Sequence, residues 1–231
     1  MQLIILVLSL LPGFVWLLFY LREDCHPEPA RLIVLTFLAG AFSGIIAYFA
    51  QTLLGEYALK PLGVASLSTI ALILMAAIEE IVKFGAAWIT VHKNPEFDEP
   101  VDAMIYAVVA ALGFATLENL GALQGNNLPE TALISGAALN IAFQTVSLRF
   151  IGATLLHTLT SAVVGYYWAM DIREFFERRL LLVGLTFATV LHAVFNYLII
   201  NHRDLSYALI FVVTIGFFVL SDFEKFRKKP V

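Results

Sequence analysis

The chain has few of the residues on which disulfide-bonded and soluble domains depend. It contains one cysteine, Cys25, among 231 residues. A single cysteine excludes an internal disulfide and a cysteine-rich metal site. Charged residues make up only 14% of the sequence, against about 25% in soluble globular proteins. The basic residues do not cluster on an element that could read a nucleic-acid groove, so we expect no nucleic-acid partner.

The local signatures of several enzyme classes are also missing. The sequence has no H-E-x-x-H zinc motif, no G-x-S-x-G nucleophile turn and no phosphate-binding P-loop. A catalytic site in this chain would therefore be assembled from residues far apart in the sequence.

Long apolar runs are abundant. Hydrophobic residues make up 60% of the chain and its mean hydropathy is +0.86, which is typical of an integral membrane protein. We predict an all-α, multi-pass protein of the cell membrane, folded as a single transmembrane helical domain over residues 1–231. Hydropathy predicts about seven spans, at residues 2–21, 32–54, 66–91, 101–124, 149–170, 180–200 and 205–221.

One further segment, residues 130–147, could form an eighth span, a re-entrant segment or an interfacial helix. Charge asymmetry favours seven spans, with the N-terminus outside, the C-terminus inside, and residues 130–147 lying on or dipping into the outer face. This arrangement leaves only Lys60, Arg149 and Arg203 outside. It places ten basic residues inside: Arg22, Arg31, Lys93, Arg173, Arg178, Arg179, Lys225, Arg227, Lys228 and Lys229.

Two adjacent carboxylates, Glu79 and Glu80, lie near the middle of the third predicted span. On insertion scales an acidic residue at this depth costs roughly 2.5–3.5 kcal/mol, so intramembrane acids usually mark a functional site. Lys83 follows at helical spacings of three and four, which bring side chains together. A structural ion pair needs one carboxylate, and this cluster has two. We therefore expect Lys83 to pair with one glutamate and the other to face a cavity.

Few other ionisable residues lie away from the ends of the spans. Glu118, His157 and His192 come from three further helices, and Asn196 follows His192 at a spacing of four on the same helix face. Each has an ordinary explanation, as a headgroup-solvated carboxylate or an interhelical hydrogen bond. Together they predict a polar cavity shared by four helices.

Carboxylates and imidazoles that converge in a membrane serve three kinds of chemistry. They bind a metal such as Zn²⁺, they activate water directly through a glutamate base, or they carry protons and ions through a transporter. Asparagine side chains are suitable donors to the oxyanion of peptide hydrolysis, which makes Asn119 and Asn196 candidates for that role.

The sequence resembles the PrsW family of intramembrane proteases, which belongs to one superfamily with the CAAX-type prenyl proteases and the Aph subunit of gamma-secretase. The resemblance covers residues 66–200 and places the catalytic core there. It rests on an ordered set of residues: Glu79-Glu80-x-x-Lys83, Phe114-x-x-x-Glu118-Asn119, His157 and His192-x-x-x-Asn196.

The resemblance implies an intramembrane endopeptidase that cuts a single-span membrane protein similar to an anti-sigma factor. It implies Glu79 and Glu80 as the catalytic glutamates, with Glu118, His157 and His192 completing the site. We add Asn196 to this catalytic set as a donor to the oxyanion. CAAX-type relatives have a histidine where this chain has Glu118. The third carboxylate favours a metal site, in which Glu79, Glu118, His157 and His192 could hold Zn²⁺. Metal-activated and metal-free glutamate mechanisms both stay open.

Two alternatives come from other functional classes. A proton- or cation-coupled transporter would use the carboxylates as a relay, but the sequence lacks the inverted repeats usual in such folds. A non-catalytic scaffold would use the same cluster to bind partner helices.

Overall fold

The computed structural model describes residues 2–22, 26–125, 136–173, 179–202 and 204–227. These residues form helices and connecting turns, with no strand among them. The elements are α1 (Gln2–Tyr20), α2 (Ala30–Leu54), η1 (Gly55–Leu59), α3 (Thr69–Val91), α4 (Pro100–Gly125), α5 (Gly136–Arg149), η3 (Phe150–Thr154), α6 (Leu155–Arg173), α7 (Arg179–Asn201) and α8 (Ser206–Arg227).

The helices form a bundle of seven rods, which confirms the all-α, multi-pass prediction. The π-helical turn η1 extends α2, and the π-helical turn η3 joins α5 to α6. Five rods in the described part of the chain are long and apolar enough to cross a membrane. The charges of Glu79, Glu80 and Lys83 set α3 apart from them. In α1 the segment Leu6–Tyr20 is a shorter apolar helix.

Residues 136–147 differ from the prediction of a separate segment at the outer face. They belong to α5, which continues through η3 into α6 without a break, so no eighth span forms here. The continuous rod is about 57 Å long at 1.5 Å per residue, and the hydrocarbon core is about 30 Å thick. Part of this rod therefore extends beyond the core at any tilt usual for a membrane helix. The remainder of the predicted segment, 130–135, lies outside the described residues.

The central helix of the bundle is α4. In its apolar segment 89% of the residues are buried, against 28% in α2 and in α8. Small residues let its neighbours approach closely. A Cβ atom on Gly40 of α2 would overlap the backbone of Ala110, and one on Gly113 of α4 would overlap that of Phe37. These contacts hold α2 against α4.

The sequence contains two G-x-x-x-G motifs, Gly40-x-x-x-Gly44 and Gly121-x-x-x-Gly125, and this pattern predicts close contact between helices. Gly40 and Gly44 of α2 both face α4, where a Cβ atom on Gly44 would lie 2.8 Å from the Leu117 side chain. Gly121 makes no such contact, because an added Cβ atom would meet nothing within 4 Å. The expectation that Gly121 lies at a close helix contact is wrong.

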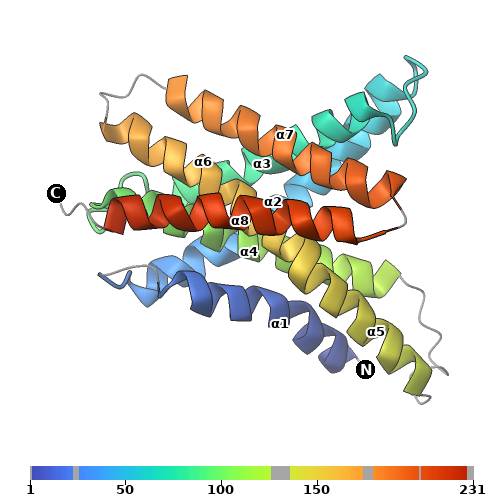
Figure 1. Ribbon diagram of the computed structural model, residues 1–231, viewed down its shortest axis with the longest axis horizontal. Coiled ribbons are helices and arrows are strands. Elements are labelled where there is room, and N and C mark those ends of the chain that lie inside the picture. The colour runs from blue at the N-terminus through green and yellow to red at the C-terminus, as the bar shows by residue number, and fades with distance from the viewer. Residues whose placement is uncertain (1, 23–25, 126–135, 174–178, 203, 228–231) are drawn as a thin grey trace.

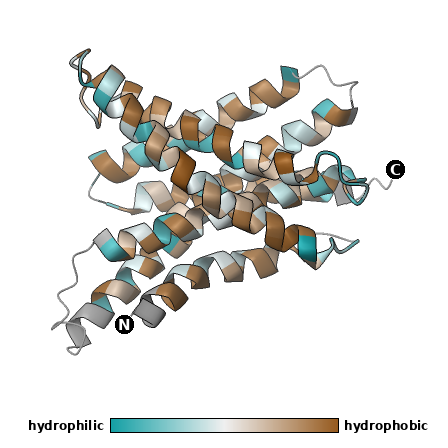
Figure 2. Cartoon of the chain, turned by 180° about the vertical axis from the view of Figure 1, so that it is seen from behind, coloured by the Kyte–Doolittle hydropathy of each residue, from teal (hydrophilic) through white to brown (hydrophobic). Residues whose placement is uncertain are grey.

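The outer surface of the bundle is apolar. Large hydrophobic side chains are exposed on the peripheral helices, including Phe217 and Phe218 of α8 at 72% and 69%. Figure 2 shows hydrophobic residues along the helices and hydrophilic residues gathered at the ends and in the loops. This pattern suits a surface that faces lipid. The termini lie toward opposite ends of the bundle (Figure 1), and which end faces outward stays a prediction.

Candidate active site

Helix α3 begins at a defined cap and carries the two glutamates into the bundle. The Ser68 side chain accepts a hydrogen bond from the backbone N–H of Ala71 at 3.3 Å, which satisfies one of the free donors at the helix start. Glu79, Glu80 and Lys83, about three to four turns further on, are all buried. Burial of three charged groups in one helix requires that neighbouring helices supply partners.

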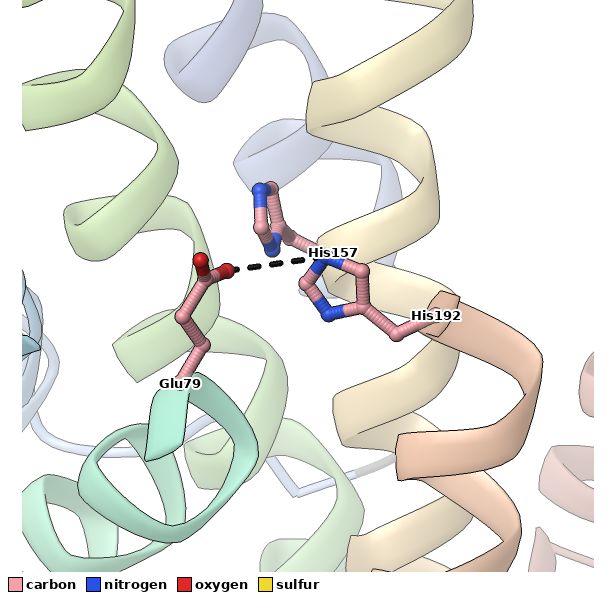
Figure 3. Close-up of side chains that lie close together, drawn as sticks. All are labelled: Glu79, His157 and His192. Atoms are coloured by element: carbon pink, nitrogen blue, oxygen red, sulfur yellow. Dashed lines mark ion pairs between the residues drawn. The ribbon is translucent and has the colours of Figure 1, made fainter. Parts of the chain in front are cut away.

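Three side chains from α3, α6 and α7 point toward one another (Figure 3). Ligand atoms of Glu79, His157 and His192 all lie within 4.8 Å of one another. His192 Nε2 is 3.5 Å from Glu79 Oε2. The centroids of the His157 and His192 rings are 5.0 Å apart. The structure thus brings together three residues that the sequence separates by up to 113 positions.

Glu80 lies outside this group of three and links α3 to α6 and α7. Its Oε1 atom accepts hydrogen bonds from Lys83 Nζ at 2.8 Å and Thr160 Oγ1 at 3.1 Å. His192 Nδ1 lies 2.7 Å from the same oxygen. Because a carboxylate only accepts, Nδ1 of His192 carries a proton toward Glu80, and Nε2 is directed toward Glu79. The two glutamates therefore have different surroundings, as expected for adjacent residues about 100° apart on a helix.

His157 lies between Lys83 and Glu118. Its Nδ1 atom is 3.2 Å from Lys83 Nζ, and its Nε2 atom is 2.8 Å from Glu118 Oε2. An ammonium group only donates, so Nδ1 accepts and Nε2 donates to Glu118. A cation bound at His157 would therefore require either loss of the Nε2 proton, for which Glu118 is the acceptor in place, or displacement of Lys83 from Nδ1.

Arg149 is the last residue of α5, directly before η3, and its side chain contacts Glu118 of α4. Its guanidinium donates to Glu118 Oε2 at 3.0 Å and to Asn119 Oδ1. Residues eight apart, such as Arg149 and His157, lie about 80° apart around an uninterrupted α-helix. The wider turn of η3 reduces that offset, which lets both side chains contact the same carboxylate. Such π-helical turns occur often at functional sites.

The two asparagines proposed as oxyanion donors have different surroundings. Asn119 is buried, and its amide group donates to Thr154 Oγ1 at 3.2 Å and to the Ser9 carbonyl at 3.4 Å. With its carbonyl on Arg149 as well, Asn119 supports Arg149 and is not free to bind an oxyanion. Asn196 is half-buried one turn after His192 and makes no hydrogen bond among the described residues.

Two contributors to the site were not identified from the sequence. Gln51 of α2 donates to Glu79 Oε1 at 2.7 Å and to the Met75 carbonyl at 3.2 Å. Thr160 of α6 donates to Glu80. A polar residue near the end of the second apolar span was the only available signal for Gln51. Thr160 follows His157 by three positions, which placed it on the same helix face.

A cation would fit among Glu79, His157 and His192. Two imidazoles and one carboxylate are the ligand types and the ligand number of a catalytic zinc site. Glu79 Oε2 is buried and has no hydrogen-bond partner among the described residues, although buried carboxylate oxygens are normally satisfied. Glu118 is not one of the three residues of this group, and it contacts His157 instead.

The buried pair Lys83–Glu80 leads to a stability prediction. Both side chains have 0% exposure. Lys83→Met would leave Glu80 buried without its cation, and we expect the free energy of unfolding to fall by about 3–5 kcal/mol. Unfolding of the purified protein in mild detergent measures the change.

Lys60→Met is the matched control, because Lys60 pairs with Glu56 at the exposed turn η1 and exposed pairs contribute little. The double variant Glu80→Gln/Lys83→Met should regain part of the lost stability. Equal unfolding of the Lys83 and Lys60 variants would contradict the structural role of Lys83.

Comparison with known proteins adds an independent finding. The chain matches the family model described as PrsW family intramembrane metalloprotease over residues 28–221. It is 30% identical over 190 residues to Protease PrsW of Geobacillus kaustophilus, covering 82% of this chain and 76% of that protein. It is 25% identical over 232 residues to Protease PrsW of Clostridioides difficile, covering 98% and 92%. Protease PrsW of Bacillus subtilis is 25% identical over 213 residues, covering 90% and 88%. No solved structure matches the chain significantly.

Proposed function

The chain belongs to the PrsW family of intramembrane metalloproteases, and on this premise we propose that Glu79, His157 and His192 form the metal site at which it cuts a single-span membrane protein. Membership of the family makes the chain a multi-pass membrane protease. It therefore favours the enzyme over the transporter and the scaffold. The proposed substrate resembles an anti-sigma factor, a membrane-anchored protein with a domain outside the bilayer.

The observation that carries this proposal is the convergence of the three buried ligand atoms within 4.8 Å. Three protein ligands leave a coordination position for water or substrate, as catalytic zinc sites require. We propose Zn²⁺ as the metal. When bound, such an ion polarises the scissile carbonyl and activates water.

Glu80 acts as a positioning residue in this scheme. Its carboxylate accepts a hydrogen bond from Nδ1 of His192. This hydrogen bond holds the imidazole with Nε2 directed toward Glu79. A carboxylate behind a metal-binding histidine fixes the tautomer and the orientation of the ring, and its loss commonly costs 10–100-fold in metal affinity or activity. Lys83 and Thr160 in turn hold Glu80.

Glu118 is the proposed proton acceptor. Its side chain is 32% exposed, more than that of Glu79 at 11% or Glu80 at 0%. A water molecule can therefore reach it. A base must lie within hydrogen-bond reach of the proton that it takes, and Glu118 already lies beside His157. Arg149 keeps its carboxylate in place. Asn196, one turn beyond His192, is the proposed donor to the oxyanion.

A cleavage assay in lipid vesicles tests the function. The purified protein would be reconstituted with single-span reporters that carry anti-sigma-factor-like outer domains. We expect cleavage of anchored reporters and no cleavage of the same peptide sequence released from the membrane. Equal cleavage of both forms, or survival of every anchored reporter, would contradict the proposal.

A further inference from the structure

A groove of about 450 Å³ lies between α2 and α4 on the outer surface of the bundle. Its outer wall includes Ile45 and Tyr48, which are 41% and 66% exposed, and its lining is mainly apolar. Because the chain is a multi-pass membrane protein, a groove bordered by these exposed side chains opens toward the lipid. A membrane protein could therefore enter it sideways without leaving the bilayer.

The groove is continuous with the candidate active site. Gln51 and Glu118 both line it. Gln51 donates to Glu79 at 2.7 Å, and Glu118 lies 2.8 Å from His157. A chain lying in the groove would thus contact two residues that directly contact the proposed metal ligands.

We propose that this groove binds an unwound segment of the substrate next to the scissile bond, a proposal that rests on the function proposed above. A peptide bond inside a transmembrane helix is protected, because its N–H and C=O groups are hydrogen-bonded along the helix. Cleavage needs an extended backbone, and free backbone groups are tolerated at membrane depth only where protein or enclosed water satisfies them.

The lining of the groove meets that requirement. Gln51, Glu118 and Gln124 place amide and carboxylate groups along otherwise apolar walls. The Gln124 amide can pair with either backbone group, because an amide side chain both donates and accepts. The Gln51 NH₂ group already donates to Glu79 and to the Met75 carbonyl, so Gln51 offers its side-chain oxygen to a backbone N–H. Ile45 and Leu117 supply apolar surface for the side chains of a membrane segment.

The size of the groove also favours an extended segment. A helix 10–12 Å across occupies on the order of 500 Å³ per turn, so a groove of about 450 Å³ would hold about one turn at most. The same volume lies within the range of sites that bind small ligands. It suits a few residues of extended chain, while the rest of the substrate helix stays in lipid.

Gly121 offers a direct test, because it lines the groove and its missing side chain leaves open space. Gly121→Leu would extend a side chain into the groove from a Cβ atom that meets no neighbour within 4 Å. Leucine also favours a helix more than glycine does, so the fold should persist. We expect cleavage of the anchored reporter to fall at least ten-fold, with unchanged zinc content and thermal unfolding.

Gly216→Leu is the matched control. Gly216 lies on α8, and an added Cβ atom there also meets nothing within 4 Å. This variant should cleave at the wild-type rate. A wild-type cleavage rate in the Gly121→Leu variant, or an equal loss of rate in both variants, would overturn the proposal.

Photo-cross-linking separates this proposal from the proposed function. A benzoylphenylalanine in place of Tyr48 should cross-link to the anchored reporter in a Glu79→Gln background, whereas the same probe in place of Phe217 on α8 should not. Binding does not need hydrolysis. Cross-linking at Tyr48 alone would therefore support the groove even if the wild-type protein cut nothing. Cleavage by the wild-type protein without cross-linking at Tyr48 would reject the groove and leave the function intact.

Discussion

Glu79→Gln should reduce cleavage of an anchored reporter by about 10²-fold or more, while the protein remains folded, because loss of a metal ligand should cost at least as much as loss of a residue that orients one. The substitution removes the charge and keeps the shape of the side chain. Its amide oxygen can still accept the hydrogen bond that Gln51 donates to Glu79 Oε1. Loss of activity would thus report on the chemistry of the carboxylate and not on helix packing. The initial rate of cleavage in lipid vesicles measures the effect.

Glu56→Gln is the control for this substitution. Glu56 lies in the turn η1, is largely exposed and pairs with Lys60, so its loss should leave the rate unchanged. Unfolding of both variants in detergent would verify that each is folded. A Glu79→Gln protein with a wild-type rate would remove Glu79 from the active site.

The second large effect concerns the metal. The wild-type protein should purify with about one zinc ion per chain, as expected for a single three-ligand site. His192→Ala should lose most of this zinc and the activity together. His192 is buried, and its Nε2 atom lies toward Glu79. Alanine would supply no nitrogen ligand at this position. Elemental analysis measures the zinc independently of cleavage.

Removal of zinc from the wild-type protein by a chelator should abolish cleavage, and added Zn²⁺ should restore it. His202→Ala is the control, because His202 is exposed after the end of α7 and should affect neither zinc nor rate. Full activity in a zinc-free protein would reject the metal site. That result would instead favour Glu79 as a base that activates water without a metal.

Much of the site could be predicted because the rules involved are local. The spacing of Glu79, Glu80 and Lys83 on one helix brings a lysine next to a glutamate, and the structure has Lys83 Nζ 2.8 Å from Glu80 Oε1. The high insertion cost of buried charge also made these residues stand out. By the same reasoning His157 and His192 were expected to face the interior, and both are buried.

Other parts of the site could not be predicted, because they depend on how helices rotate and slide against one another. Gln51 of α2 contacts Glu79 of α3, a contact that depends on how these two helices are rotated against each other. Asn119 and Asn196 are equivalent as sequence features, yet Asn119 is occupied by Arg149 and Thr154. The π-helical turn η3 has no clear sequence signal, and it directs Arg149 toward Glu118.

The sequence by itself determined the membrane location, the seven rods and the buried ionisable residues Glu79, Glu80, Lys83, His157 and His192. These follow from apolar length, from helical period and from the cost of placing charge in lipid. Only the tertiary structure decided which glutamate faces the two histidines, which one holds them in place, and where a groove reaches the site. Those outcomes depend on helix rotation and interhelical contact, which arise from packing across the whole bundle.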